Sequence, residues 1–187
     1  MNQPSTTGSL ASETTGTSKL FFANVTCLGD KAWKYILHDV CIDHDYIGLC
    51  ETHIGRAATA PWANAARQQS LKSFFNPARP KSREAALKPG GEGYANEGGE
   101  LILVKNHRAA QLLDEARSAT GLKAARGGSN SFDGFVPCVF HMRGFAIAVF
   151  VFYGISGIGM CNENVSRFRK LGGLLRALQL PWIVVAD

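Results

Sequence analysis

Apolar residues along this chain come in short runs that alternate with stretches of helical spacing. The runs are rich in β-branched and aromatic residues, which is typical of buried strands. They predict strands over Leu20–Thr26, Tyr46–Cys50, Glu100–Lys105, Gly134–His141, Phe145–Tyr153 and Trp182–Ala186. Apolar positions three or four residues apart predict helices over 30–41, 63–75, 108–119 and 162–178. This mixture favours an α/β fold, a sheet with helices on its outer face.

Some boundaries of these elements are marked by polar residues and glycine. Asp30 is placed to cap the first helix, and either Asn162 or Asn164 the last, because short polar side chains bond the free N–H groups of a helix start. The inner face of the last helix is expected to be formed by Val165, Phe168, Leu171, Leu175 and Leu178. Residues 142–144, which end in glycine, predict a hairpin turn between two strands.

The chain of 187 residues is long enough for one domain with a real core. Residues 1–18 are rich in Ser, Thr and Gly and lack the apolar stretch of a signal peptide, so we expect a disordered tail followed by a domain over 19–187. The uncharged stretch 144–161 is interrupted by glycines and predicts a strand and a loop, not a membrane span. An intracellular location, nuclear or cytoplasmic, is therefore expected, with no membrane partner.

The net charge of +5 is unevenly distributed. Between positions 56 and 88 the only acidic residue is Glu84, and the basic residues are Arg56, Arg67, Lys72, Arg79, Lys81, Arg83 and Lys88. Such a segment predicts a surface that contacts the phosphate backbone of a nucleic acid. The alternative is a solvated basic loop without a partner.

Polar side chains close three of the apolar runs: Asn24, Glu51 and Asp187. When such strand ends meet at one edge of a sheet, an amide and two carboxylates offer the hard oxygen ligands that suit Mg²⁺, with Mn²⁺ as an alternative. The alternative reading is that strand ends meet solvent and are polar for that reason. The His, Cys and acidic residues of 38–53 match no zinc-finger spacing. His53 is read as a surface loop residue that could touch a substrate.

These residues carry a resemblance to a family. The N-terminal part of the chain resembles that of the endonuclease/exonuclease/phosphatase superfamily: Asn24 is followed by a helix and then by Asp45–His53 (DYIGLCETH). That group includes apurinic-site endonucleases, LINE-type retroelement endonucleases, DNase I and inositol-polyphosphate 5-phosphatases. Further similar segments are the Gly-rich approach to a strand at 98–105, the strand ending in a phosphate-proximal tyrosine at 145–153, and the stretch toward a G-D-x-N motif at 164–168 and 182–187. The resemblance covers residues 19–187.

The resemblance implies a DNase I-like four-layer α/β/β/α sandwich and metal-dependent phosphoester hydrolysis. Glu51 would be the principal Mg²⁺ ligand, and Asn24 would orient the metal shell or a phosphate oxygen. Tyr153 would contact the reacting phosphate, and Asp187 would orient or activate the attacking water. The basic segment and Glu51–His53 favour nucleic acid as the substrate.

The chain departs from the family pattern at its end. Ala186 stands where the motif has glycine, and the motif asparagine, a later acidic residue and a closing histidine have no counterpart. We therefore expect the N-terminal portion of a sandwich, inactive or incomplete by itself, with an exposed apolar sheet face and poor solubility. A separate chain or a C-terminal half would complete it. The alternative functions are a non-catalytic remnant that binds nucleic acid or protein, and a phosphatase for a small phosphorylated substrate.

Overall fold

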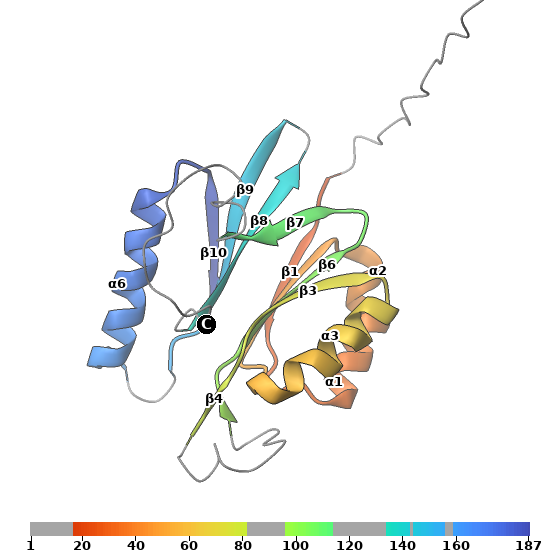
Figure 1. Cartoon of the computed structure of the whole chain (residues 1–187), viewed down its shortest axis with the longest axis horizontal. Coiled ribbons are helices and arrows are strands. Elements are labelled where there is room, and N and C mark those ends of the chain that lie inside the picture. The colour runs from red at the N-terminus through yellow and green to blue at the C-terminus, as the bar shows by residue number, and fades with distance from the viewer. Residues whose placement is uncertain (1–16, 82–95, 114–133, 143, 156–158) are drawn as a thin grey trace, which may run out of the picture.

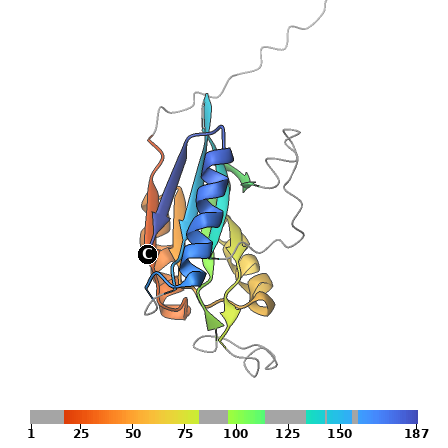
Figure 2. The same ribbon diagram turned by 90° about the vertical axis from the view of Figure 1, so that its left-hand side faces the viewer.

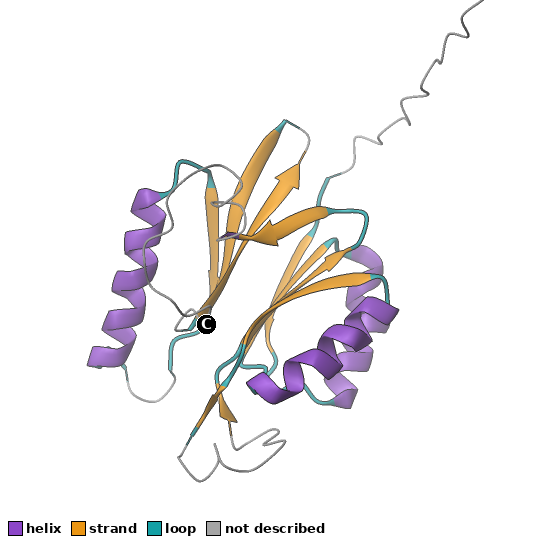
Figure 3. Cartoon of the chain, viewed as in Figure 1, coloured by secondary structure: helices purple, strands orange, loops and turns teal. Residues whose placement is uncertain are grey.

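The computed structural model describes residues 17–81, 96–113, 134–142, 144–155 and 159–187. Their two four-stranded sheets lie face to face, and helices cover the outer surface of each (Figure 1). Figure 3 shows the resulting order of layers: helix, sheet, sheet, helix. The α/β sandwich implied by the family resemblance is thereby confirmed.

The first sheet has the strand order β1-β2-β6-β3. Its strands are β1 (Leu20–Asn24), β2 (Tyr46–Cys50), β6 (Glu100–Lys105) and β3 (Leu71–Asn76). The edge pair β1 and β2 is parallel, and β6 runs antiparallel to both β2 and β3. The carboxyl ends of β1, β2 and β3 therefore lie at the end of the sheet where β6 begins, and we call this the site end.

The second sheet repeats this pattern of strand directions in the order β10-β9-β8-β7. Its strands are β10 (Trp182–Ala186), β9 (Phe145–Phe152), β8 (Phe135–Met142) and β7 (Ala109–Leu112). The edge pair β10 and β9 is parallel, and the two following pairs are antiparallel. A two-stranded ribbon of β4 (Arg79–Pro80) and β5 (Asn96–Glu97) extends from the site end.

The helices lie outside the sheets. On the first sheet α1 (Asp30–Tyr35) continues through a π-helical turn (Ile36–Val40) into α2 (Cys41–Asp43), and α3 (Thr59–Gln68) follows a 3-10 turn at Arg56–Ala58. α1 and α3 meet through the rings of Trp33 and Trp62, whose centroids are 5.2 Å apart. The second sheet is covered by α6 (Asn162–Ala177), which stands in front of β9 and β10 in Figure 2.

Three apolar layers hold the sandwich together: helices on the first sheet, sheet on sheet, and α6 on the second sheet. Between the sheets, the rings of Tyr46 and Phe140 stack with centroids 4.0 Å apart. Gly48 lets the sheets approach closely, because a Cβ at this position would lie 2.7 Å from a methyl group of Val151. The inner sheet faces are therefore packed against each other.

This packing corrects the expectation of an exposed sheet face. Both sheets are present within the described residues, and each inner face covers the other. Large exposed apolar side chains occur instead at places such as the edge strand β10, where Trp182 is 49% and Ile183 41% exposed.

Several predicted elements need correction. The helix expected over 63–75 ends at Gln68, and Leu71–Asn76 is a strand because it pairs with β6 along its whole length. Residues 109–112 form β7 instead of a helix, and most of the remainder of that prediction, 114–119, lies outside the described residues.

The predicted helix caps also need correction. Asp30 is the first residue of α1 and not its cap, which is Gly29. Cys161 precedes α6, and neither Asn162 nor Asn164 caps it. Phe168 is 46% exposed, although its ring contacts Phe152.

Within the described part of the chain, no helix has both the length and the apolar character needed to cross a membrane.

Candidate active site

The site end of the sandwich brings together side chains from strands far apart in the sequence. Asn24 is the exposed last residue of β1, and Asp187 follows β10, where Figure 1 marks the carboxyl terminus. The Asn24 amide Nδ2 donates a hydrogen bond to Asp187 Oδ2. Asn24 Oδ1 accepts the backbone N–H of Thr26 at 2.8 Å, which fixes the orientation of the amide. The structure therefore links the two sheets through two of the residues singled out from the sequence.

Glu51 lies directly after β2 at the same end. The Tyr153 hydroxyl donates to Glu51 Oε1 at 3.2 Å, and His53 Nε2 lies 3.7 Å from the same oxygen. The side chain of Glu51 is 18% exposed, so it stays accessible to a ligand. Glu51 and Asp187 both lie near the buried Cys50: burial first, and then the charges of Asp187, Glu100 and Glu51, raise the pKa of its thiol to about 12.

The backbone that presents Glu51 is strained. Glu51 and His53 have φ values of 56° and 58°, in the left-handed region that side-chain-bearing residues seldom adopt. Such conformations cost about 1–3 kcal/mol each and persist only where the surroundings impose them. In this chain, the surroundings are backbone hydrogen bonds from Thr52 N to Gly99 O and from His53 N to Gly98 O, each 2.9 Å long.

The Gly98-Gly99 pair is required for that approach. Both residues have positive φ values, 69° and 90°. A Cβ on Gly99 would lie 2.8 Å from Thr52 Oγ1, and a Cβ on Gly98 would lie 3.4 Å from the ring of Tyr153. The Gly-rich start of segment 98–105 thus has a physical role, because only glycine lets β6 begin against the Glu51–His53 turn.

A cavity of about 200 Å³ opens beside Glu51. Its walls include Glu51, His53, Lys81, Glu97, Tyr153 and Arg167. His53 is 6% exposed, so its interpretation as a surface loop histidine is wrong. Burial, assisted by the positive charge of Lys81, lowers the pKa of His53 in spite of the opposing charge of Glu51.

The basic residues of the predicted nucleic-acid surface are dispersed. Arg79 and Lys81 lie at the site end, where Arg79 forms ion pairs with Glu163 and Glu97, and Lys81 lines the cavity. Arg56 is exposed on the 3-10 turn after the Glu51–His53 segment. Lys72 lies at the opposite end of β3, where its ammonium group donates to Arg108 O at 2.8 Å. Arg67 is exposed near the end of α3 and donates to Asn64. Arg83 and Lys88 lie outside the described residues.

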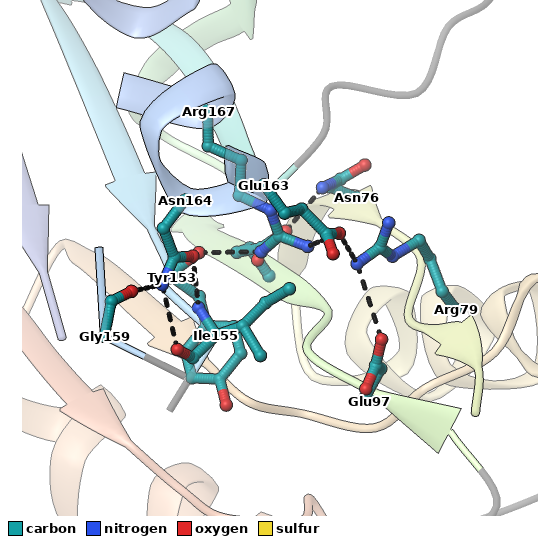
Figure 4. Close-up of polar contacts among 10 residues, drawn as sticks. Asn76, Arg79, Glu97, Tyr153, Ile155, Gly159, Glu163, Asn164 and Arg167 are labelled. Carbon is teal, nitrogen blue, oxygen red and sulfur yellow. Dashed lines mark hydrogen bonds and ion pairs between the residues drawn. The ribbon is translucent and has the colours of Figure 1, made fainter. Parts of the chain in front are cut away.

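Several polar residues at this end have no catalytic or binding role in the sequence prediction. Glu100 begins β6 and is 1% exposed, and Asn76 Nδ2 donates to its Oε2 at 2.5 Å. On the first turns of α6, Asn164 and Arg167 are both buried and bond the segment that follows β9, as Figure 4 shows. Two signals in the sequence could have found them. Glu100 is a charged residue that opens an apolar run, and Asn164 and Arg167 are polar residues three positions apart in a predicted helix.

The donor set fits a hard divalent cation. Mg²⁺ takes one or two protein carboxylates and completes its shell with water and substrate phosphate. The described residues contain no group of three His, Cys, Asp or Glu side chains arranged as a metal cluster. Glu51, with Asn24 at the end of the neighbouring strand β1 and Asp187 after β10 of the second sheet, supplies oxygen donors of the kind that Mg²⁺ binds in small number.

Comparison with known proteins identifies the fold. No protein-family model and no curated protein sequence matches the chain. Among solved structures, the endonuclease domain of TRAS1, a telomere-specific non-LTR retrotransposon, matches with a TM-score of 0.51 and 8% identity over 91% of this chain and 58% of that chain. The AP endonuclease LMAP from Leishmania major matches with a TM-score of 0.53 and 16% identity over 91% of this chain and 54% of that chain.

The chain thus spans just over half the length of these two structures. At such low identity the likeness establishes the fold and not the activity. The chain has the fold of these two endonuclease structures, the α/β/β/α sandwich that the family resemblance implied.

Proposed function

We propose that this domain is a phosphoesterase of the endonuclease type, in which Glu51 binds Mg²⁺ or Mn²⁺ and nucleic-acid phosphodiesters are the substrate. The observation that supports it most is the convergence of Asn24, Glu51, Tyr153 and Asp187 at one end of the sandwich, joined in pairs by hydrogen bonds. Four groups from four different strand ends meet there.

Each residue has a defined part in this proposal. When bound, the cation neutralises charge on the phosphoryl oxygens. Tyr153 donates to one oxygen of Glu51, which leaves the other oxygen for the cation. The Asp187 carboxylate accepts a hydrogen bond from Asn24 and is exposed, so it can orient a water molecule and take a proton from it.

Nucleic acid is favoured over a small phosphorylated substrate by the charge of the surroundings. Arg56, Arg79 and Lys81 are exposed near the proposed site and can approach a phosphate backbone. Both solved structures reported above are named as endonucleases. Because the chain covers 54–58% of their length, hydrolysis by this chain is itself part of the proposal, and nucleic-acid binding without cleavage is the second candidate.

The test is hydrolysis of three substrates by the wild-type chain with and without Mg²⁺: supercoiled plasmid, a duplex with one abasic site, and an inositol phosphate. Glu51→Gln should abolish turnover while leaving plasmid binding nearly intact. Asp43→Asn, which removes an exposed carboxylate at the other end of the first sheet, is the matched control and should cleave normally.

The outcomes separate the candidates. Cleavage of the inositol phosphate alone would reject the nuclease and support a phosphatase. Salt-dependent plasmid binding without cleavage of any substrate would support the binding candidate. Equal cleavage by wild type and Glu51→Gln would show that Glu51 is not the metal ligand.

A further inference from the structure

The side of α6 nearest the site end is polar where a helix normally packs apolar side chains. Asn164 is 5% and Arg167 is 4% exposed, and both lie on the buried side of the helix, one turn apart. Burying an arginine and an asparagine side by side is costly unless their polar atoms have partners. Their partners should therefore reveal what this part of the helix holds in place.

Asn164 holds the chain that follows Tyr153. Its Oδ1 accepts the N–H of Ile155 at 2.9 Å, and its Nδ2 donates to Ile155 O at 3.0 Å and to Gly159 O at 2.7 Å (Figure 4). One side chain thus satisfies three backbone groups beyond the end of β9. A buried amide with this many bonds fixes the path of the backbone.

Arg167 holds Tyr153 itself. Its Nη1 donates to Tyr153 O at 3.0 Å, and Tyr153 N donates to Gly134 O at 2.8 Å. The guanidinium group reaches this carbonyl by passing over Gly134, which has φ of 82°. A Cβ on Gly134 would lie 2.7 Å from Nη1 and 2.9 Å from Cδ of Arg167. The glycine therefore provides the space through which the arginine reaches Tyr153.

These bonds determine where the tyrosine side chain points. The backbone N–H and C=O of Tyr153 are both bonded, and Gly154 N donates to Asp187 O at 3.0 Å. With the backbone held on both sides, the ring lies against Gly98 and its hydroxyl reaches Glu51. We propose that Arg167 is a positioning residue for Tyr153, and that it holds the tyrosine hydroxyl on the Glu51 carboxylate. The effect on the reaction rate rests on the proposed function, but the effect on Tyr153 does not.

The exposed ion pairs around Arg167 are secondary. Arg167 Nη2 lies 3.3 Å from Glu163 Oε1, which also pairs with Arg79 at 2.5 Å, and Arg79 reaches Glu97 at 3.4 Å. These partners are 38–45% exposed, and ion pairs in water contribute little. The buried bond to the Tyr153 carbonyl is therefore the one that we expect to matter.

The test observes Tyr153 by NMR in the full chain labelled with ¹³C-tyrosine, with its ring signal assigned from Tyr153→Phe. Arg167→Met removes the donors and preserves most of the apolar volume. Arg167→Lys keeps one cationic donor for the carbonyl. Arg176→Met, an exposed arginine in the last turn of α6, is the control. Cooperative thermal unfolding confirms that each variant is folded.

We expect the Tyr153 ring signal to shift and broaden in Arg167→Met, to return close to its wild-type position in Arg167→Lys, and to be unchanged in Arg176→Met. An unchanged signal in folded Arg167→Met would overturn the proposal. If Arg167→Met does not fold, Arg167→Lys and Glu163→Gln decide the proposal. Arg167→Lys should keep the Tyr153 ring signal near its wild-type position, and Glu163→Gln should barely move it. A larger shift in Glu163→Gln than in Arg167→Lys would overturn the proposal.

A kinetic measurement adds a second readout when the wild type hydrolyses a substrate. Loss of an outer-shell partner typically lowers activity about 10- to 100-fold. Arg167→Met should therefore lower kcat by about that factor with KM changed less than about twofold, because the orientation of the site and not substrate binding is affected. An inactive wild type would reject the proposed function and leave the tyrosine signal to decide the role of Arg167.

Discussion

The pKa of a buried carboxyl group is shifted in opposite directions at the two ends of the first sheet. At the end away from the site, Asp45 accepts hydrogen bonds from Arg108 at 3.0 Å and from the backbone N–H of Lys19 at 3.2 Å. Burial by itself would raise the pKa of Asp45, but these bonds and the neighbouring positive charges outweigh it and lower the pKa. The carboxylate is thus stabilised in its charged form.

At the site end, Glu100 is almost fully buried and forms no ion pair with another residue that the structure describes. Burial raises the pKa of its carboxyl group to about 8, although Asn76 and the more distant Arg167 and Arg79 act in the other direction. Its Oε1, together with polar atoms of His53 and Arg167, has no hydrogen-bond partner among the described residues. Strain is concentrated there too, in the left-handed backbone of Thr26, Glu51 and His53. Stability is given up at the end where function is proposed, as expected of a site.

The largest effect is expected at Gly99, where the strain of the site end is held in place. Gly99→Ala should lower the free energy of unfolding by about 3 kcal/mol or more, because the new Cβ meets Thr52 Oγ1 at 2.8 Å and the backbone of Ala78 at 3.0 Å. Gly144→Ala is the control: its φ is also positive, 83°, but no atom lies within 4 Å of the added Cβ.

Urea denaturation of both variants separates the two contributions. Gly144→Ala should lose only the backbone term of about 1 kcal/mol. Equal losses in the two variants would show that the contact with the Glu51–His53 turn is not tight.

Glu100 should make the stability of the chain depend on pH in the opposite sense to Asp45. Its pKa rises from 4.5 to about 8 on folding, so between these values the folded chain holds a proton that the unfolded chain has released. Stability from this group is present below pH 4.5 and is lost as the pH rises toward 8, at up to about 1.4 kcal/mol per pH unit. Glu100→Gln should remove this decline.

The measurement is the free energy of unfolding from urea titrations at several pH values between 5 and 8 for wild type and Glu100→Gln. The neutral amide keeps an acceptor for Asn76 and cannot ionise, so its curve should be flatter than that of the wild type. Parallel curves would mean that Glu100 is ionised in the folded chain at neutral pH.

Asp45→Asn is expected to have a smaller effect, of about 1–3 kcal/mol at neutral pH, because a charge-assisted bond to Arg108 is weakened. The pKa of Asp45 is lower in the folded chain than the ordinary value of 3.8, so its stabilisation is present above that value and is lost as the pH falls through the folded pKa. Thermal melts from pH 7 to 2 should show the difference between wild type and variant shrinking in acid. A constant difference would attribute the loss to packing alone.

The same contrast explains what the sequence could predict. Strands with uniform apolar runs, such as Phe145–Phe152, and the polar residues at their ends could be read from composition alone, because burial dictates both. Leu71–Asn76 could not, since its polar residues reflect an edge position in the sheet that only pairing with β6 reveals. The sequence likewise predicts a helix at residues 109–112, because their spacing does not record the antiparallel partner β8.

Within the candidate site, the residues at strand ends were predictable, whereas the residues that hold them in place were not. Asn24, Glu51, Tyr153 and Asp187 follow apolar runs, so their common edge follows from topology. Arg167 and Asn164 come from a helix on the far side of the second sheet, and nothing in the order of residues states that the first turns of α6 bond to Tyr153 and Ile155. The strained φ of Glu51 and His53 is equally invisible, because neither residue type favours it.

The smallest predicted effect tests whether strain serves the site. Ser70, at the end away from the site, also has a left-handed φ of 57°, in an exposed turn between α3 and β3. Ser70→Gly should stabilise the chain by at most about 1 kcal/mol, since relief of the strain is partly offset by the greater freedom of glycine in the unfolded chain. The matched change at the site end is His53→Gly.

His53→Gly relieves a similar conformation but deletes a buried ring that lies beside Glu51 and lines the cavity. This substitution should destabilise the chain. The comparison is between the signs of the changes in unfolding free energy that Ser70→Gly and His53→Gly produce, measured by parallel denaturation curves. If the signs are opposite, the left-handed backbone at the site end is retained for the His53 side chain that it presents. At Ser70, where the strain positions no such side chain, it can be removed without loss of stability. Stabilisation by both substitutions would mean that the site end gains nothing from His53.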